Sequence, residues 1–512
     1  MKSKISFMKK IGHLFKVAAV YFFTAIFASQ CFAQSSANST ANIDKRSQQY
    51  MEMLNGVFDF VQRNYVDEVD PQVLYTGALK GMLSALNDPY TVYLDNSTFR
   101  SLNDTTKGKF GGVGLSISKP FESTPEKPAY VEVASPVEDT PGFRAGIQAG
   151  DLIISANGTD TSTITMDEVL DILRGPVGEK VELIIRRGKN IEFPVTLKRA
   201  MIEVPTVKYG TIKEVQKAGT VGYVRIIEFT PQTAERVQQA LDSFAKEKIS
   251  ALIIDLRNNP GGLITSVVEV ADKFIDKGPI VSTKSRLSFE NSVYTASPRK
   301  TTFKSKVPIV VLINRGSASA SEILSGALKD NHLAYLVGQR TYGKGSVQQV
   351  LPLSSTEGLK ITMARYYTPS DTNIDKIGIP PDREVLFPEF GETGDKQYTE
   401  LMKSGEIEKY VEQNHAGHDM TEAQIAAYAE KLHQKYDAID LPTLRKLVRN
   451  EANRTKGAML YDLDWDIQLV AALDILSTSR AEFDALVKNT KTLKELQEEA
   501  ALKEGVAAVE KK

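Results

Sequence analysis

Three serines lie in the turn that follows an apolar segment at residues 307–313. They are Ser317, Ser319 and Ser321, and apolar residues at helical spacing then predict a helix over 319–330. The backbone N–H groups at a helix start favour negative charge, so a serine here could attack a carbonyl and have its oxyanion stabilised. Serine-rich helix starts are more often simple N-caps, and this segment alone does not distinguish the two interpretations.

The candidate base for such a serine is a lysine. His332 is the only histidine between residues 220 and 385, and it lies at the far end of the same predicted helix, too distant at about 1.5 Å per residue. Lys344 stands between two glycines just after the apolar run 333–337. A lysine with its ordinary pKa of about 10.4 is protonated, but burial disfavours the charged form. The alternative interpretation is a solvated hairpin lysine.

A second turn could supply oxyanion donors. The apolar strand expected at 252–256 ends in Asn-Asn-Pro-Gly-Gly. The amide of Gly261 or Gly262, together with that of Ala320, could complete an oxyanion hole. The alternative is a plain turn at the end of a strand.

A glycine-rich turn at 109–114 precedes an alternating strand. Consecutive amides in such a turn can hold a carboxylate, and the strand edge can accept an extended peptide. The alternative is an ordinary glycine turn in a small β domain. The predicted peptide contacts are Gly112, Val113, Gly114, Leu115 and Ile117 of the turn and strand, with Leu170 and Leu173 of a helix expected at 166–174.

Four motifs together closely resemble those of the C-terminal processing peptidases, also called tail-specific proteases. They are D-L-R-N-N-P-G-G, G-S-A-S-A-S-E-I-L-S-G-A-L-K-D-N, T-Y-G-K-G-S-V-Q and Y-Y-T-P-S, and the resemblance covers roughly residues 60–385. It implies a Ser-Lys serine endopeptidase with Ser319 as nucleophile, Lys344 as general base and Gln348 orienting the lysine amine. Ser317 and Ser321 are the competing nucleophiles. Asp371 departs from the family, which usually has glycine after Tyr-Thr-Pro-Ser.

Residues 103–200 resemble a PDZ domain. The resemblance rests on the glycine-rich turn together with Ser135-Pro136, Arg144-Ala145-Gly146, Ala149-Gly150-Asp151 and Asn157-Gly158. In the family this domain binds the substrate's C-terminus and gates the active site. The resemblance therefore implies protein substrates with apolar C-terminal tails, cleaved near those tails.

Composition limits the other functions. The chain has 512 residues, 42% hydrophobic and 25% charged, as in ordinary globular proteins of about three domains. A net charge of −1 gives no basic face for nucleic acid. One cysteine excludes an internal disulfide, and His415, His418 and His433 lie outside any acid-rich or cysteine-rich context. We therefore expect neither a metal nor a cofactor.

Residues 1–33 have the pattern of a secretory signal peptide. Five lysines and no acidic residue accompany the apolar run 17–28, and Cys31-Phe32-Ala33 precedes Gln34. Cleavage after Ala33 would remove the cysteine and all five lysines, which changes the net charge from −1 to −6. The alternative is an uncleaved anchor, although the apolar run is shorter than the roughly 20 residues that span a membrane. We expect an exported protein, periplasmic or envelope-associated.

The expected fold is multidomain, α/β plus β. Apolar runs of strand length alternate with helical patterns between 220 and 385, which predicts an α/β layer with parallel strands. The family resemblance implies a crotonase-like form of this core. The predicted parts are a signal peptide at 1–33, a linker at 34–43, a helical domain at 44–100, the PDZ domain at 103–200, the protease core at 205–388 and a helical region at 390–512.

Several alternatives stay open. The helical region 390–512 could dock on the protease, form a homo-oligomer or hold an adaptor such as a lipoprotein. A different class of function is a catalytically inactive scaffold whose PDZ domain captures protein tails. An inactive relative would be free to lose Ser319, Lys344 or Gln348, and all three are present, which favours an enzyme. A crotonase-like acyl-CoA enzyme is disfavoured, because acyl-CoA chemistry is cytoplasmic and the leader predicts export.

Overall fold

The computed structural model describes most of the chain from residue 45 to residue 510. The gaps are 97, 100–101, 103–108, 120–127, 138–139, 148–149, 188–190, 204, 216, 304–306, 416–418 and 454–458. The predicted signal peptide 1–33 and linker 34–43 lie outside the described residues. Two compact units are present, one ending at Pro89 and one beginning at Tyr90. Among the described helices, none is long and apolar enough to cross a membrane.

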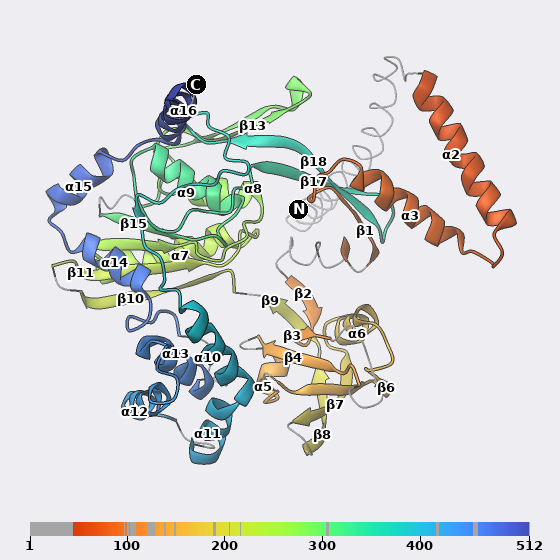
Figure 1. Cartoon of the computed structure of the whole chain (residues 1–512), viewed down its shortest axis with the longest axis horizontal. Coiled ribbons are helices and arrows are strands. Elements are labelled where there is room, and N and C mark those ends of the chain that lie inside the picture. The colour runs from red at the N-terminus through yellow and green to blue at the C-terminus, as the bar shows by residue number, and fades with distance from the viewer. Residues whose placement is uncertain are drawn as a thin grey trace, which may run out of the picture. The chain divides into compact units, whose positions relative to one another are not determined.

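Two helices make up the described part of the first unit (Figure 1). They are α2, Lys45–Asn64, and α3, Pro71–Ser84, and both confirm the predicted helical spacing. Helix α3 begins after Asp70, whose carboxylate accepts a hydrogen bond of 2.8 Å from the Gln72 amide. Pro71 suits the first helical position because it has no N–H group to satisfy.

The predicted PDZ segment forms a small β domain. Its sheet has the order β3-β4-β5-β7-β8, with β6 paired to β5, and a separate pair joins β2 to β9. Alternate residues of β7 pack with Val169 of α6 in one apolar core. Each strand and the helix expected from the alternating pattern is present. The elements are β2 Lys109–Gly112, β3 Leu115–Ser118, β4 Val131–Pro136, α5 Pro141–Arg144, β5 Leu152–Ala156, β6 Thr159–Asp160, α6 Met166–Leu173, β7 Lys180–Arg187, β8 Ile191–Lys198 and β9 Ala200–Glu203.

A six-stranded sheet forms the centre of the protease core. Its order is β10-β11-β12-β15-β16-β19, and the pairings from β11 to β19 are parallel, as predicted. Every residue of β12 and β15 is buried, which is typical of parallel strands covered on both faces. The elements are β10 Val207–Val215, β11 Gly219–Ile226, α7 Thr233–Glu247, β12 Ala251–Asp255, α8 Ile264–Ala271, β15 Ile309–Ile313, α9 Ala320–Asp330, β16 Tyr335–Gly338 and β19 Arg383–Glu384.

Helices from distant parts of the sequence cover the two faces of this sheet. Helices α7, α8 and α9 share one apolar cluster with Ile254 and Val311. Helix α14, Ile467–Leu476, packs on the other face with Ile253 and Val310. Figure 1 shows α14, in blue, beside the sheet. Part of the C-terminal region therefore belongs to the core of the protease.

A second, mainly antiparallel sheet was not predicted from the sequence. Its order is β1-β18-β13-β14, and β17 also pairs with β18. These strands mix half-buried and exposed residues, so no continuous apolar run marks them. Strand β17 begins two residues after Lys344 and connects this sheet to the candidate site. The elements are β1 Val92–Leu94, β13 Gly278–Ser285, a 3₁₀ turn at Ser288–Glu290, β14 Ser292–Ala296, β17 Ser346–Pro352 and β18 Gly358–Tyr367.

The C-terminal helices fall into two groups. Helices α10 to α13 enclose a core of their own that includes Leu432, Tyr436 and Leu444. Helices α14 to α16 instead contribute Leu469, Phe483 and other residues to the protease clusters. The predicted helical character is confirmed. The remaining bounds are α10 Gly391–Ser404, α11 Glu406–His415, α12 Glu422–His433, α13 Leu441–Ala452, α15 Arg480–Lys488 and α16 Leu493–Glu510.

Candidate active site

Ser319 directly precedes α9 and has an unusual backbone conformation. Its φ of 53° and ψ of −113° lie outside the regions that residues with a Cβ atom favour. Such strain costs of order 1–3 kcal/mol and persists only where the surroundings enforce it. The Ser319 side chain is half-buried. The neighbouring Ala320 amide belongs to the first turn of α9, where N–H groups have no acceptor within the helix.

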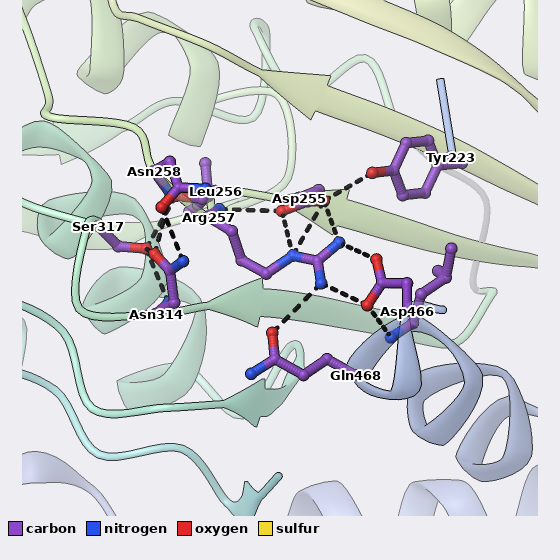
Figure 2. A network of polar contacts seen from close by, with 10 residues as sticks. Tyr223, Asp255, Leu256, Arg257, Asn258, Asn314, Ser317, Asp466 and Gln468 are labelled. Atoms are coloured by element: carbon purple, nitrogen blue, oxygen red, sulfur yellow. Dashed lines mark hydrogen bonds and ion pairs between the residues drawn. The ribbon is translucent and has the colours of Figure 1, made fainter. Parts of the chain in front are cut away.

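The other two serines of this turn are fully buried and bind backbone carbonyls. Ser317 Oγ donates to Leu256 O over 2.8 Å, a contact shown in Figure 2. Ser321 Oγ donates to Asn259 O over 3.0 Å. Both hydroxyls therefore hold the serine turn against the 256–262 turn, which is a structural use of the side chain.

Gly261 and Gly262 pass close to the serine turn in a conformation that requires glycine. Their φ angles are 107° and 137°, a region that other residues rarely adopt. A Cβ atom on Gly261 would lie 2.7 Å from Ser319 Cβ, and one on Gly262 would lie 2.2 Å from Phe229 O. The Gly261 amide donates to Asn259 Oδ1 over 2.8 Å. An oxyanion would have to compete with Asn259 for that amide.

Glu322 joins the serine turn to the glycine-lysine-glycine turn. Its carboxylate is fully buried and accepts hydrogen bonds from the amides of Ser319 at 2.9 Å, Gly343 at 2.8 Å and Lys344 at 2.8 Å. Thr341 Oγ1 donates to it over 2.5 Å. A single side chain thus fixes the relative positions of the Ser319 and Lys344 backbones.

Burial has the largest effect on the acidity of this carboxyl group. It raises the pKa of Glu322, while the hydrogen bonds from Thr341 and from the three amides act in the opposite direction. An ionised carboxylate only accepts hydrogen bonds, so the four donors suit the ionised form.

The turn that carries Lys344 is packed tightly on both sides. A Cβ atom on Gly343 would lie 2.9 Å from Gly378 N, and one on Gly345 would lie 2.5 Å from Asp375 N. The Tyr366 hydroxyl donates to Lys344 O and lies 3.3 Å from Ser319 O. Glycine on each side therefore allows the half-buried Lys344 to lie within this packed turn.

Tyr90 covers the Lys344 side chain and was not singled out by the sequence. Lys344 Nζ lies 4.9 Å from the centre of the Tyr90 ring, within the range of cation–π contacts. Burial raises the pKa of Tyr90, and a hydrogen bond with Tyr342 and the charges of Asp375 and Glu322 act in the same direction. The hydroxyl therefore stays protonated, and the ring lies among the groups of the candidate site.

Gln348 lies on β17, four residues beyond the lysine. Its Nε2 donates to Ser346 Oγ over 2.9 Å and lies 3.4 Å from Thr362 Oγ1 on β18. Thr362 N in turn donates to Thr91 Oγ1 over 3.1 Å. The structure thus connects Gln348 to the second sheet, and its contact with the lysine amine stays a prediction.

The described histidines, His332, His415 and His433, lie away from this site. His332 follows the end of α9, and its Nδ1 contacts Thr490 Oγ1 at 3.1 Å. His433 Nδ1 contacts Ile439 O at 2.9 Å, His415 ends α11, and His418 is outside the described residues. Within the described part of the chain, no group of three or more His, Cys, Asp or Glu side chains could hold a metal ion.

The predicted peptide contacts of the PDZ domain divide by burial. Val113 and Leu173 lie in its apolar core, whereas Leu115, Ile117 and Leu170 are half-buried. Gly112 ends β2, and a Cβ atom on Gly114, whose φ is 75°, would lie 2.2 Å from Thr140 Cβ. Among the described residues β3 pairs with β4 alone, so its other edge faces no described strand.

Comparisons with known proteins agree with this architecture. Family models match residues 220–385 (Peptidase family S41), 132–187 (PDZ domain) and 14–98 (Activating protease CtpB N-terminal domain). A carboxy-terminal-processing protease of Bartonella bacilliformis is 37% identical over 374 residues, which are 72% of this chain and 82% of that protein. This chain belongs to the carboxy-terminal processing protease family. The carboxy-terminal processing protease CtpB of Bacillus subtilis is 33% identical, over 71% of this chain and 74% of that protein.

A solved structure of a photosystem II D1 C-terminal processing protease is 32% identical. The match covers 65% of this chain and 92% of the chain in that solved structure, with a TM-score of 0.41. Membership of the processing-protease family makes this protein a serine peptidase with a PDZ domain and an α/β core.

The turn at Asp371, where the family resemblance leads us to expect glycine, forms nonetheless. Its φ is 60°, the left-handed region that glycine adopts readily and that aspartate tolerates better than most residues. The Asp371 amide donates to Thr368 O over 2.9 Å, and the Thr368 amide donates to Thr372 O over 3.0 Å. The Asp371 carboxylate pairs with Lys284 at 2.5 Å.

Proposed function

We propose that this processing protease is an exported endopeptidase that cleaves proteins near their C-termini, with Ser319 as nucleophile and Lys344 as general base. The observation that carries the proposal is the shared carboxylate. Glu322 Oε2 accepts from the Ser319 amide at 2.9 Å and from the Lys344 amide at 2.8 Å. Both backbones therefore approach one atom, which supports the assignment of the Ser319 hydroxyl and the Lys344 amine to one site.

Burial supports Ser319 over its neighbours. The hydroxyls of Ser317 and Ser321 are fully buried and donate to carbonyls, so attack on a substrate would break a structural contact. The Ser319 side chain is half-buried and lies beside the glycine turn.

The proposed reaction is acyl transfer. Neutral Lys344 takes the proton of the Ser319 hydroxyl as its oxygen bonds to the scissile carbonyl carbon. The protonated lysine then gives that proton to the leaving amine as the C–N bond breaks. A water that Lys344 deprotonates next attacks the acyl carbon, the bond from that carbon to Ser319 Oγ breaks, and Lys344 returns the proton to Ser319 Oγ. Gln348 is proposed to orient the amine.

Backbone amides are proposed to stabilise the oxyanion. Ala320 lies at the start of α9 and suits this role by position. Because Asn259 already accepts from Gly261, Gly262 is the favoured partner of Ala320.

The PDZ domain is proposed to bind the C-terminal tail of the substrate and to control access to the site. The half-buried Leu115, Ile117 and Leu170 could contact an apolar terminal side chain. The leader 1–33 supports export to the periplasm or envelope. An adaptor lipoprotein and a homo-oligomer stay predictions for the C-terminal region.

Cleavage assays with tailed substrates test this proposal. Chain 34–512, its Ser319→Ala variant and its Lys344→Arg variant would each be incubated with a test protein bearing an apolar or a charged tail. We expect only the unchanged chain to cleave, with preference for the apolar tail. Ser319→Ala lacks the nucleophile, and the arginine of Lys344→Arg stays protonated at any working pH.

Ser321→Ala is the matched control for the nucleophile, and we expect it to keep measurable cleavage. Retained cleavage by Ser319→Ala would refute the assignment. Tail binding without any cleavage by the unchanged chain would favour the inactive PDZ scaffold instead.

A further inference from the structure

We propose that Asp466 and Gln468, at the start of α14, are positioning residues for the active-site turn 256–262. Both lie beyond residue 385, where the match to the peptidase model ends. The inference rests on the proposed function, because it assumes that this turn supplies an oxyanion donor.

Arg257 is the residue through which α14 reaches the turn (Figure 2). Its Nη1 and Nη2 donate to the two oxygens of Asp466, each over 2.6 Å. Nη1 also lies 3.2 Å from Gln468 Oε1. Two parallel hydrogen bonds of this kind fix direction as well as distance.

The same guanidinium holds the end of β12. Arg257 Nη2 donates to Asp255 Oδ2 over 2.6 Å, and Tyr223 donates to that oxygen over 2.6 Å as well. Burial alone would raise the pKa of Asp255, but the charge and hydrogen bonds of Arg257 keep it below its ordinary value. One cation therefore binds two carboxylates from segments more than 200 residues apart.

The three charged side chains of this network are buried, so the network is not a surface contact. The side chains of Asp255, Asp466 and Arg257 are 1%, 9% and 11% exposed. Without Asp466, a buried guanidinium would lose one of its two carboxylates. Removing one partner of a buried ion pair destabilises a protein far more than removing a partner of an exposed pair.

The residues after Arg257 carry the effect to Ser319. Asn258 adopts a φ of 58° and exchanges hydrogen bonds of 2.9 Å with Asn314 at the start of the serine turn. Asn259 O accepts from the Ala318 amide over 3.0 Å, directly before Ser319. A shift of Arg257 would therefore displace the donors around Ser319.

Helix α14 is itself anchored, so it can serve as a reference for the turn. Asp466 Oδ1 caps the helix by accepting from the Leu469 amide over 3.0 Å. Gln468 Nε2 donates to Val385 O over 2.8 Å, and Leu469 is fully buried against the sheet.

Asp466→Asn tests the inference in chain 34–512. Asparagine keeps an oxygen for the helix cap but removes the charge. We expect kcat on the apolar-tailed test protein and the rate of Ser319 labelling by a small fluorophosphonate to fall about tenfold or more, with KM within about twofold. The matched control is Asp464→Asn, because Asp464 is 56% exposed and pairs with Arg449, and we expect changes within about twofold there.

The labelling rate separates positioning from a structural role. It would be measured at a temperature at which circular dichroism shows both variants folded. Equal labelling of Asp466→Asn and Asp464→Asn would overturn the inference. If Asp466→Asn does not fold, Gln468→Met is the deciding variant. We expect it to lower the labelling rate about two- to fivefold, the effect expected from the loss of one hydrogen bond. An unchanged labelling rate in Gln468→Met would also overturn the inference. If the chain without substitutions were neither labelled nor active, the proposed function itself would be refuted.

Discussion

Among single residues, Glu322 has the widest influence on the site. Glutamine at this position would turn an NH₂ group toward buried donors, and at least one amide would lose its acceptor. We expect Glu322→Gln to lower the free energy of unfolding by about 1–3 kcal/mol and kcat by about tenfold or more. Thermal unfolding and initial rates would measure both effects. Glu392→Gln is the control, because that side chain is 85% exposed, and an equal effect of the two would contradict the role of Glu322.

The loss of unfolding free energy in Glu322→Gln depends on pH, and the sign of that dependence is defined. Burial raises the pKa of Glu322 above its unfolded value, so the carboxyl group binds a proton more readily in the folded chain than in the unfolded chain. The stability from this shift is full at pH values below the ordinary carboxyl range and is lost as the pH rises through the folded pKa. The difference in unfolding free energy between the unchanged chain and Glu322→Gln should therefore shrink as the pH rises above the ordinary carboxyl pKa of about 4.3. A growing difference would mean that the hydrogen bonds outweigh burial.

Residue types and motifs predicted Ser319, Lys344 and the glycine pair, but not the residues that hold them. Glu322 stands three positions after Ser319, the spacing of a capping box, and that signal was available in the sequence. Tyr90 lies 254 positions before Lys344, and nothing local predicts that its ring covers the amine. Contacts of this kind depend on sheet pairings, which spacing along the chain does not encode.

Among the structural elements, the glycine turn 259–262 sets the space beside the nucleophile. Alanine at Gly261 would combine an unfavourable φ of 107° with a Cβ atom 2.7 Å from Ser319 Cβ. We expect Gly261→Ala to abolish cleavage and to lose about 1–3 kcal/mol of stability. Gly278→Ala in the same domain is the matched control, because its φ is 95° but a Cβ atom there would have no neighbour within 4 Å. Unfolding curves and cleavage rates of the two variants would separate the effect of backbone strain from the effect of the contact with Ser319. Equal losses of activity in both variants would argue against the role of that contact.

The parallel strands were predictable and the second sheet was not. Strands β12 and β15 are fully buried and, apart from Asp255, entirely apolar, so their sequence predicts them directly. Strands β17 and β18 are half-buried and carry polar residues, as in Ser-Val-Gln-Gln-Val. Their pairing depends on partners such as β1 and β13 from distant parts of the chain.

In the whole molecule, the C-terminal region has two different relations to the protease. Periodicity predicted its helices but not their partners. Apolar residues mark one side of α14, at Leu469, Ala472 and Leu476, and apolar residues such as Leu432 of α12 and Leu444 of α13 mark the earlier helices in a similar way. The first set is buried against the central sheet and the second forms a separate core. An amphipathic pattern shows that a face is covered, and only the fold shows by what.

Tail recognition is the property that requires the whole molecule, and Leu170 of α6 offers a way to test it. This side chain is half-buried, unlike its neighbours Val169 and Leu173 in the PDZ core, so a lysine there should leave the domain folded. We expect Leu170→Lys to raise KM for an apolar-tailed substrate about tenfold or more, because an ammonium would enter the proposed apolar pocket, with little change in kcat. The exposed Asp171→Lys is the matched control and should change KM less than about twofold. If both variants raised KM equally, the loss would come from the added charge on α6 and not from a lost contact with Leu170.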